Sequence, residues 1–588
     1  MYLAQLWNDP RIRPNPFINA GKVENMDLED VRASMMSRRS ALKTGGLALL
    51  LTQGALLEQV VVAPARPALA ATSFSDIQFD IGRFMPSGTF AGTNTYNDGG
   101  GPIVASFGPI FTLFTPIKLT RTPTKADQTT LANALAEIEA NFDASPSGLL
   151  IVSVSYGLPY FNRLPASLVA ANMPRLASST SRFVLENAVA GPTDVVNGVV
   201  QGAQNPPPKE RFNVNVVLEQ NDMLLQMRSD SMANLTNALA WLQGSNNLHG
   251  NVVTSPSFNG LFSYQTSRVQ FMQPGMPRRM ADQAAAANPN FYEFHTRINP
   301  DSSMVMGFVD QQHDSSAPNA ATVTFVGDPG NSNTQGFTTA KAGDYFDNGS
   351  IVHFSHDIDD LYQFYQTAAQ DPTGGGGEPF SERVQYMFRS NQTSGGSNFF
   401  GLPCQPNSDE FTNGGGPAFV NNVFEGTGAA ALGAAAKDGK ATTQANGDQN
   451  ATFTGEPRLG HEVALQQTSR AADGTPLHIR MDGPGFDGMD VPAFQTHPDM
   501  PSISVPVPAG TSQFKLQFLI FVPTSEFFRQ MRISAGAQDL FAKFGQPAVP
   551  NGVQFADNGL ERFITATRRQ NLLVPPRRHR AFPLIELT

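Results

Sequence analysis

Two short stretches of this chain place residues that can do chemistry next to apolar runs. Asp310 follows the run Met-Gly-Phe-Val at 306–309, so its carboxylate stands where a strand would end. His478 lies far downstream, in the strand-like stretch Leu-His-Ile-Arg at 477–480. Taken alone, an aspartate in such a turn most often accepts backbone N–H groups. A lone histidine on a strand is most often an ordinary packed or surface residue, so spacing alone leaves both roles open.

The cysteine count narrows the kinds of site that the chain can build. Cys404 is the single cysteine of 588 residues. An intramolecular disulfide is therefore impossible, and iron–sulfur clusters and cysteine-rich zinc sites are excluded. Histidine, aspartate and glutamate remain as candidate ligands.

A second group of candidate ligands lies in the segment 353–360. His353 and His356 are separated by an odd number of residues, so on a strand they point to opposite faces. We therefore do not expect them to share a metal ion. The aspartates that follow are better explained as the N-cap and first-turn acids of a helix that begins near Asp357. They are Asp357, Asp359 and Asp360.

Length and composition indicate a soluble, loop-rich protein with more than one core. At 588 residues the chain is long enough for two core units with insertions. Only 15% of the residues are charged, the formal net charge is -10, and there are 52 glycines and 44 prolines. An acidic balance argues against a nucleic-acid partner, which would require a basic face.

The amino terminus has the features of a twin-arginine export signal. Residues 37–43 (Ser-Arg-Arg-Ser-Ala-Leu-Lys) precede an apolar run at 45–62, and Ala-Leu-Ala at 68–70 is a small-x-small cleavage site. The alternative is a membrane anchor, but polar residues interrupt the run, namely Gln53, Glu58 and Gln59. We expect cleavage near Ala70, no integral membrane segment afterwards, and a periplasmic or extracellular location.

The order of predicted elements is β-α-β-β-α-β, which is a ferredoxin-like unit. Its strands are predicted at 109–119, 149–155, 222–228 and 264–272, and its helices at 126–142 and 232–242. A looser copy follows, with strands at 350–354, 475–481 and 514–522, and with helices beginning near residues 357 and 524.

Two further segments have distinctive compositions. Residues from 371 to about 460 are rich in Gly, Asn, Ala, Thr and Gln without an apolar period, and we interpret them as a surface insertion. Residues 546–588 read as a basic C-terminal tail packed on the acidic body, with an anionic partner as the alternative. The predicted parts are a leader at 1–70, an N-terminal domain at 71–300, a C-terminal domain at 301–545 and this tail.

The landmarks taken together resemble the dye-decolourising (DyP-type) haem peroxidases. The matching features are the Gly307-Phe308-x-Asp310 turn and the strand-borne His478-x-Arg480. Three further strands match in the same order, at 150–161, 221–226 and 515–521. The resemblance implies an α+β fold of tandem ferredoxin-like units with antiparallel sheets, in which the second unit holds haem.

The resemblance also implies roles for individual residues. His478 would ligate the iron of haem b, and Asp310 would act as the acid–base group toward hydrogen peroxide. Arg480 would pair with a haem propionate, and Gly307 and Phe308 would line the cofactor site. The implied activity is peroxide-dependent oxidation of an organic reductant by an exported enzyme. The oligomeric state stays open, with a homo-oligomer as one alternative.

Two departures from the family pattern favour an alternative function. The family turn continues with glycine, whereas Gln311 follows Asp310 here. The family also carries a distal arginine after the proximal histidine, but no arginine lies between Arg480 and Arg529. Loss of such a donor typically costs roughly 10²-fold or more in rate. The alternative is a catalytically silent secreted relative that binds a ligand or serves a structural role, with haem lost or carried without turnover.

Overall fold

The computed structural model describes residues 74–81, 95–97, 102–104, 109–191, 193–201, 212–272, 275–287, 298, 305, 320–331, 334–361, 452–453, 456–457, 477–493, 508–535 and 563–588. All of them belong to one compact unit of the chain, residues 49–588. The predicted leader, the turn from Gly307 to Asp310 and most of the predicted insertion lie outside the described residues. The helices within these ranges include none that is long and apolar enough to cross a membrane.

The first ferredoxin-like unit contains four strand positions and two helices. In chain order they are β3 (Phe111–Leu119), α3 (Lys125–Asn141), β4 (Leu150–Tyr156), β10 (Met223–Ser229), α6 (Met232–Leu242), and a last strand split into β13 (Phe262–Tyr264) and β14 (Arg268–Phe271). All neighbouring strands are antiparallel, and β13 and β14 pair with β3, which pairs with β10, which pairs with β4. Numbered by appearance, the strand order is 4-1-3-2, which defines a ferredoxin-like sheet.

Local sequence explains where the two helices of this unit begin. Thr124 and Asp127 form a capping box at the start of α3, in which each side chain bonds the other residue's backbone N–H. Ser231 caps α6 by accepting from the backbone N–H of Asn234. Both helices bury apolar residues at helical spacing, such as Leu131 and Leu135 in α3.

The second unit repeats this arrangement. Its described elements are β15 (Ser350–Asp359), β18 (Ile479–Arg480), β19 (Gly483–Asp487), β20 (Gln513–Val522), α14 (Ser525–Ala535) and β21 (Ile564–Val574). β21 pairs with β15, β15 with β20, and β20 with both β18 and β19, all antiparallel. This is again the order 4-1-3-2, so the predicted tandem of ferredoxin-like units with antiparallel sheets is confirmed.

The structure corrects the prediction of a helix beginning near Asp357. β15 continues to Asp359, because it is hydrogen-bonded to β21 on one side and to β20 on the other along almost its whole length. Asp357, Asp359 and Asp360 are buried on and just after this strand rather than capping a helix. Two flanking ladders outweigh the helix-capping preference of aspartate here.

The structure also corrects the prediction of a C-terminal tail. Residues 564–574 form β21, a strand between β15 and β4 in the middle of the sheet. The residues after it are held by ion pairs to acids of the body, as the favoured interpretation of this basic segment expected. Arg577 and Arg580 pair with Glu139, and Arg578 pairs with Asp76 and Asp347.

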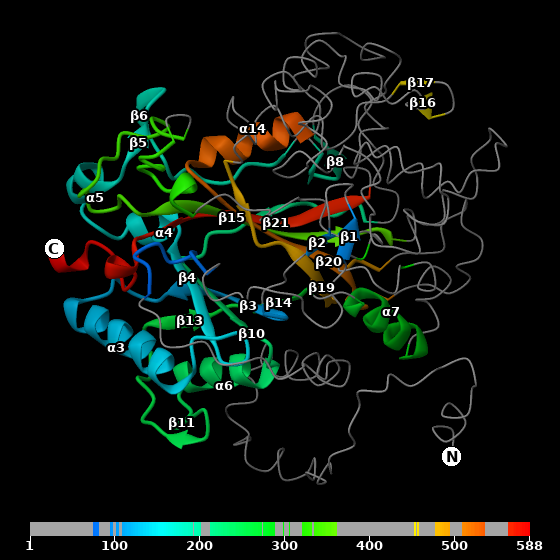
Figure 1. The fold of residues 1–588 in the computed structure, drawn as a ribbon, viewed down its shortest axis with the longest axis horizontal. Coiled ribbons are helices and arrows are strands. Elements are labelled where there is room, and N and C mark those ends of the chain that lie inside the picture. The colour runs from blue at the N-terminus through cyan, green and yellow to red at the C-terminus, as the bar shows by residue number, and fades with distance from the viewer. Residues whose placement is uncertain are drawn as a thin grey trace. The chain divides into compact units, whose positions relative to one another are not determined.

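The two units share one sheet and one apolar core. β21 pairs with β4 at Leu573 and Tyr156, which joins the two four-stranded halves. At the opposite ends of the sheet β14 and β19 approach closely, since a Cβ on Gly485 would lie 2.8 Å from the carbonyl oxygen of Val269. Side chains from both halves meet in between, including Phe114 and Phe354, whose ring centroids are 4.7 Å apart. Figure 1 shows β15 and β21 at the centre of the view, with α14 on one side and α3 and α6 on the other.

Candidate functional site

The predicted haem-site residues fall into two groups. Gly307, Phe308 and Asp310 lie outside the described residues, so their predicted roles stay predictions. His478 and Arg480 lie on and next to β18, and only 5% of the surface of His478 is exposed. Ile479 between them belongs to the apolar core. Side chains alternate along a strand, so His478 and Arg480 point away from that core.

The face of the second sheet opposite the core carries a continuous buried hydrogen-bond network. Ser355 and His353 lie on β15, and their Oγ and Nε2 atoms are 2.8 Å apart. His353 Nδ1 lies 2.6 Å from the Oδ1 atom of Asn571 on β21. Arg569 on β21 donates to Ser355 Oγ and forms two hydrogen bonds to Asp194, at 2.6 and 2.8 Å. We refer to these five residues as the outer network.

The donors and acceptors of the outer network determine where its protons lie. Arg569 can only donate, so Ser355 Oγ accepts from it. The Asn571 amide donates to the carbonyl oxygen of Glu186, so Asn571 Oδ1 accepts from His353, whose proton is therefore on Nδ1. In the neutral ring Nε2 then accepts from the Ser355 hydroxyl. Every bond is satisfied with a neutral imidazole. Burial first, and then the charge of Arg569, hold the pKa of His353 well below its ordinary value.

The order Ser355, His353, Asn571 superficially matches a nucleophile, a base and an orienting group. Such a triad needs a serine hydroxyl that a substrate can reach. Ser355 is fully buried, and its oxygen already accepts from Arg569. The outer network therefore connects β15 and β21 structurally and is not a hydrolytic centre.

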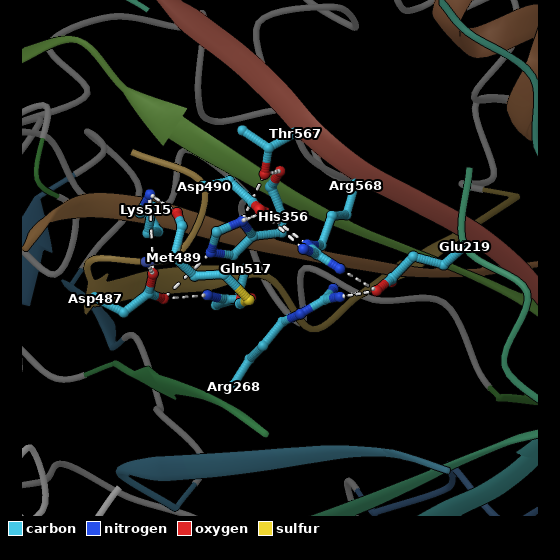
Figure 2. Close-up of polar contacts among 10 residues, drawn as sticks. All are labelled: Glu219, Arg268, His356, Asp487, Met489, Asp490, Lys515, Gln517, Thr567 and Arg568. Carbon is cyan, nitrogen blue, oxygen red and sulfur yellow. Dashed lines mark hydrogen bonds and ion pairs between the residues drawn. The ribbon is translucent and has the colours of Figure 1, made fainter. Parts of the chain in front are cut away.

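A second buried network lies on the core side of β15, and Figure 2 shows its members. His356 is at its centre. His356 Nδ1 lies 2.7 Å from Thr567 Oγ1, and Nε2 lies 3.2 Å from Asp487 Oδ2. Lys515 on β20 donates to the carbonyl oxygen of Met489 at 2.8 Å, and its Nζ atom is 3.8 Å from Asp487 Oδ1. We refer to His356 and the charged residues linked to it as the inner network, namely Asp487, Asp490, Lys515, Arg568, Glu219 and Arg268.

The inner network continues through a chain of ion pairs. Arg568 forms two hydrogen bonds to Asp490, at 2.6 and 2.8 Å, and a third to Glu219 at 3.2 Å. Glu219 also accepts from Arg268 at 2.5 Å. The guanidinium of Arg268 stands over the ring of Phe354, 4.6 Å from its centroid, so the network borders the apolar core directly.

Charge balance explains the protonation of the inner network. Arg268, Arg568 and Lys515 are matched by Glu219, Asp487 and Asp490, so the group is neutral when His356 is neutral. Burial lowers the pKa of His356, although Asp487 opposes this shift. Burial would raise the pKa of Asp487, but the hydrogen bond from His356, the charge of Lys515 and the backbone N–H of Met489 hold it below its ordinary value. Adding a proton to His356 would place an uncompensated charge in the interior.

The aspartates at the end of β15 do not form a metal centre in the described part of the chain. Burial, together with the neighbouring Asp357 and Asp360, raises the pKa of Asp359 well above its ordinary value, so its protonated form is favoured. Within the described ranges, no group of three or more His, Cys, Asp or Glu side chains could hold a metal ion. His353 and His356 contact different partners on opposite faces, as their spacing predicted.

Sequence analysis did not single out the charged residues that hold these networks together. Lys515 gave the clearest available signal, because it is an isolated lysine inside the apolar strand Phe-Lys-Leu-Gln-Phe-Leu-Ile-Phe at 514–521. Arg268 and Arg569 gave a weaker one, since each lies in a strand that is buried on both faces. A charge at such a position is almost always paired, although the sequence does not say with what.

No family model matches the chain, and no curated protein matches its sequence. Among solved structures, the chain is similar to a DyP-type peroxidase protein from Shewanella oneidensis, with 12% identity, a TM-score of 0.38, and 80% of this chain and 94% of that chain covered. It is similar to the encapsulated DyP-type peroxidase from Mycobacterium smegmatis, with 13% identity, a TM-score of 0.37, and coverage of 80% and 94%. A DypB variant from Rhodococcus jostii RHA1 in complex with heme gives 12% identity, a TM-score of 0.36, and coverage of 81% and 96%. The strand order 4-1-3-2 in each unit defines the fold.

Two described histidines lie on the face of the second sheet that is turned away from the core, and they differ as haem ligands. An axial ligand must present one ring nitrogen to the iron. His353 has both ring nitrogens bonded inside the outer network, and Phe528 stacks on its ring at 3.5 Å between centroids. It does not fit that role. His478, two residues before Arg480, lies on the same face and stays the ligand that the sequence predicts.

Proposed function

We propose that the chain is a haem-dependent peroxidase that uses hydrogen peroxide to oxidise an organic reductant. The observation that carries the proposal is the tandem of ferredoxin-like sheets, with a buried His478 on the face of the second sheet that points away from the core. The strand-borne His-x-Arg and the Gly-Phe-x-Asp turn in the sequence support it.

Each residue of the proposed site has a distinct part. Haem b, when bound, supplies the redox chemistry with peroxide. His478 would hold the iron, and Arg480 would neutralise a propionate by a charge-assisted hydrogen bond. Asp310 would move the peroxide proton, for which a carboxylate is suited when its pKa lies near the working pH.

The visible spectrum of the haem-supplemented protein tests the ligand directly. We expect a Soret band in the wild-type protein and its loss in His478→Ala. His353→Gln is the matched control, because His353 is as deeply buried on the same face but is bonded at both ring nitrogens. A Soret band that survives His478→Ala, or that disappears in His353→Gln while the far-ultraviolet circular dichroism is retained, contradicts the assignment.

The alternative function is a silent relative of the same fold, and the lack of an arginine between Arg480 and Arg529 favours it. Peroxide-dependent bleaching of an anthraquinone dye separates the two functions. Activity that Asp310→Asn lowers by roughly 10²-fold supports the enzyme. A normal Soret band without bleaching supports a haem carrier.

Export through the twin-arginine pathway is part of the same proposal. It rests on Arg38-Arg39, the apolar run after them and the cleavage site at Ala70. We expect the exported protein to begin just after Ala70, and Arg38→Lys combined with Arg39→Lys to keep it in the cytoplasm. The mass of the intact protein in each fraction measures this, and an exported protein that retains the first 70 residues would contradict it.

A further inference from the structure

A pocket of about 510 Å³ opens beside the outer network. The segment 186–191 of the first unit forms one wall, and α14 of the second unit forms another. His353 and Asn571 of the outer network also line the pocket. Pockets that bind small molecules typically have volumes of roughly 300–1,000 Å³, so this one has the size of a ligand site.

Cations dominate the walls of this pocket although the whole chain is acidic. Arg182, Arg529 and Arg532 line it, together with one acid, Glu186. Glu186 is already bonded to one of these arginines, because Arg182 donates to it at 2.7 and 2.5 Å. The remaining arginines therefore give the pocket a positive potential that attracts anions.

Among the described residues, Arg529 has one weak ion pair. Its nearest acid is Glu526, at 3.8 Å, which is beyond hydrogen-bond distance. The same carboxylate oxygen of Glu526 already accepts from Arg182 at 2.7 Å. Arg529 is 45% exposed. It can therefore turn its guanidinium toward an anion in the pocket without breaking a strong ion pair.

The lining is otherwise mixed, with polar residues such as Asn187, Gln201 and Ser525 and an apolar part. In the apolar part, Val189 is 53% exposed and stands between Ala188 and Ala190. Phe528 of α14 also lines the pocket and stacks on His353. Such a surface favours a ligand with an apolar body, since covering exposed apolar area stabilises a complex.

We propose that this pocket binds an organic anion, specifically a carboxylate carried on a compact apolar body. The carboxylate would be bound by Arg529, with Arg532 nearby, and the apolar body would lie against Val189 and Phe528. Arg532 is itself positioned by a hydrogen bond to Thr193, so the cationic wall is partly preorganised. The proposal does not depend on haem, because none of these residues belongs to the proposed haem site.

Isothermal titration calorimetry of 1-naphthoate binding to the purified chain tests the proposal. We expect Arg529→Gln to weaken binding about tenfold, the effect of losing one partly exposed charge-assisted hydrogen bond. The neutral analogue 1-naphthalenemethanol should bind the wild-type protein about tenfold more weakly than the acid, and should bind Arg529→Gln and the wild type equally.

Arg121→Gln is the matched control. Arg121 is 48% exposed and also pairs with a first-turn acid, Asp127 of α3, but it lies outside the pocket. The Arg121→Gln substitution should leave naphthoate binding unchanged. Val189→Asp places a like charge on the apolar wall and should abolish binding. Equal affinity in Arg529→Gln and the wild type, equal affinity of acid and alcohol, or no naphthoate binding at millimolar concentration would each overturn the proposal, whatever the Soret band shows.

Discussion

The two faces of β15 bury two histidines in opposite electrostatic surroundings. His353 lies in the outer network, where the nearest charged group is the cation Arg569 and every hydrogen bond is satisfied by a neutral ring. His356 lies in the inner network, between the carboxylates of Asp487 and Asp490 at 3.2 and 3.8 Å. The residues are three apart in the chain, yet the strand places them in different environments.

The difference shows that proximity to an acid does not by itself fix the charge of a buried histidine. The carboxylates around His356 are already matched by Lys515 and Arg568, so they favour its protonation only partly. No carboxylate of the described residues forms a hydrogen bond or ion pair with His353, and both burial and Arg569 act against its protonation. The charge of a buried histidine depends on the charge balance of the whole network and not on the nearest pair.

The arginines of β21 give the largest expected contrast between the two faces. Arg569 and Asp194 are 4% and 2% exposed, whereas Arg568 and Asp490 are 28% and 19% exposed. Asp194→Ala leaves a buried, uncompensated guanidinium, so we expect it to lower the free energy of unfolding by about 3–5 kcal/mol. Urea denaturation at neutral pH measures the change.

Asp490→Ala is the control for that measurement. It removes a partner of Arg568 on the core side of β15, where the pair is partly exposed and Glu219 remains as a second acceptor. We expect a smaller loss, of about 1–2 kcal/mol. Asp194→Asn keeps the shape of the side chain and so separates charge from packing. If the two alanine variants lost equal stability, the contrast between the faces would be wrong.

Much of the fold could be predicted from the sequence, because its signals are local. The apolar strands, the capping box of α3 and the start of α14 all lie within single segments, and their order gave the tandem units. β15 and β21 were misjudged for a shared reason. The aspartates of β15 resemble a helix start and the arginines of β21 resemble a tail. Local sequence does not reveal the ladders on both sides of β15, or the ladder and the bridge that hold β21 between β15 and β4.

The candidate site was less predictable, because its contacts join residues far apart in the chain. The spacing of His353 and His356 correctly placed them on opposite faces. Their partners could not be inferred, since Asp487 is 131 residues from His356 and Asn571 is 218 residues from His353. A pairing of this kind depends on strand order and register, which arise only when distant strands of the second unit come together.

The smaller expected contrast between the faces concerns acid stability. A histidine that stays neutral when folded has a pKa below its ordinary value of 6.5, while in the unfolded chain it titrates near 6.5. Below that pH the unfolded state binds one proton more than the folded state, so stability falls as the pH falls. For a histidine like His353, the loss between pH 7.5 and pH 5 is roughly 2 kcal/mol.

Replacing each histidine separately should therefore have unequal effects on this pH dependence. His353→Gln should remove a contribution of about 2 kcal/mol from the difference in unfolding free energy between pH 7.5 and pH 5. His356→Gln should remove less, because Asp487 and Asp490 partly offset the effect of burial on the His356 pKa. Urea unfolding of both variants at the two pH values gives the change in unfolding free energy with pH. A loss of stability that is the same at both pH values cancels in this comparison. Equal slopes for the two variants would mean that the networks on the two faces bury their histidines at the same electrostatic cost.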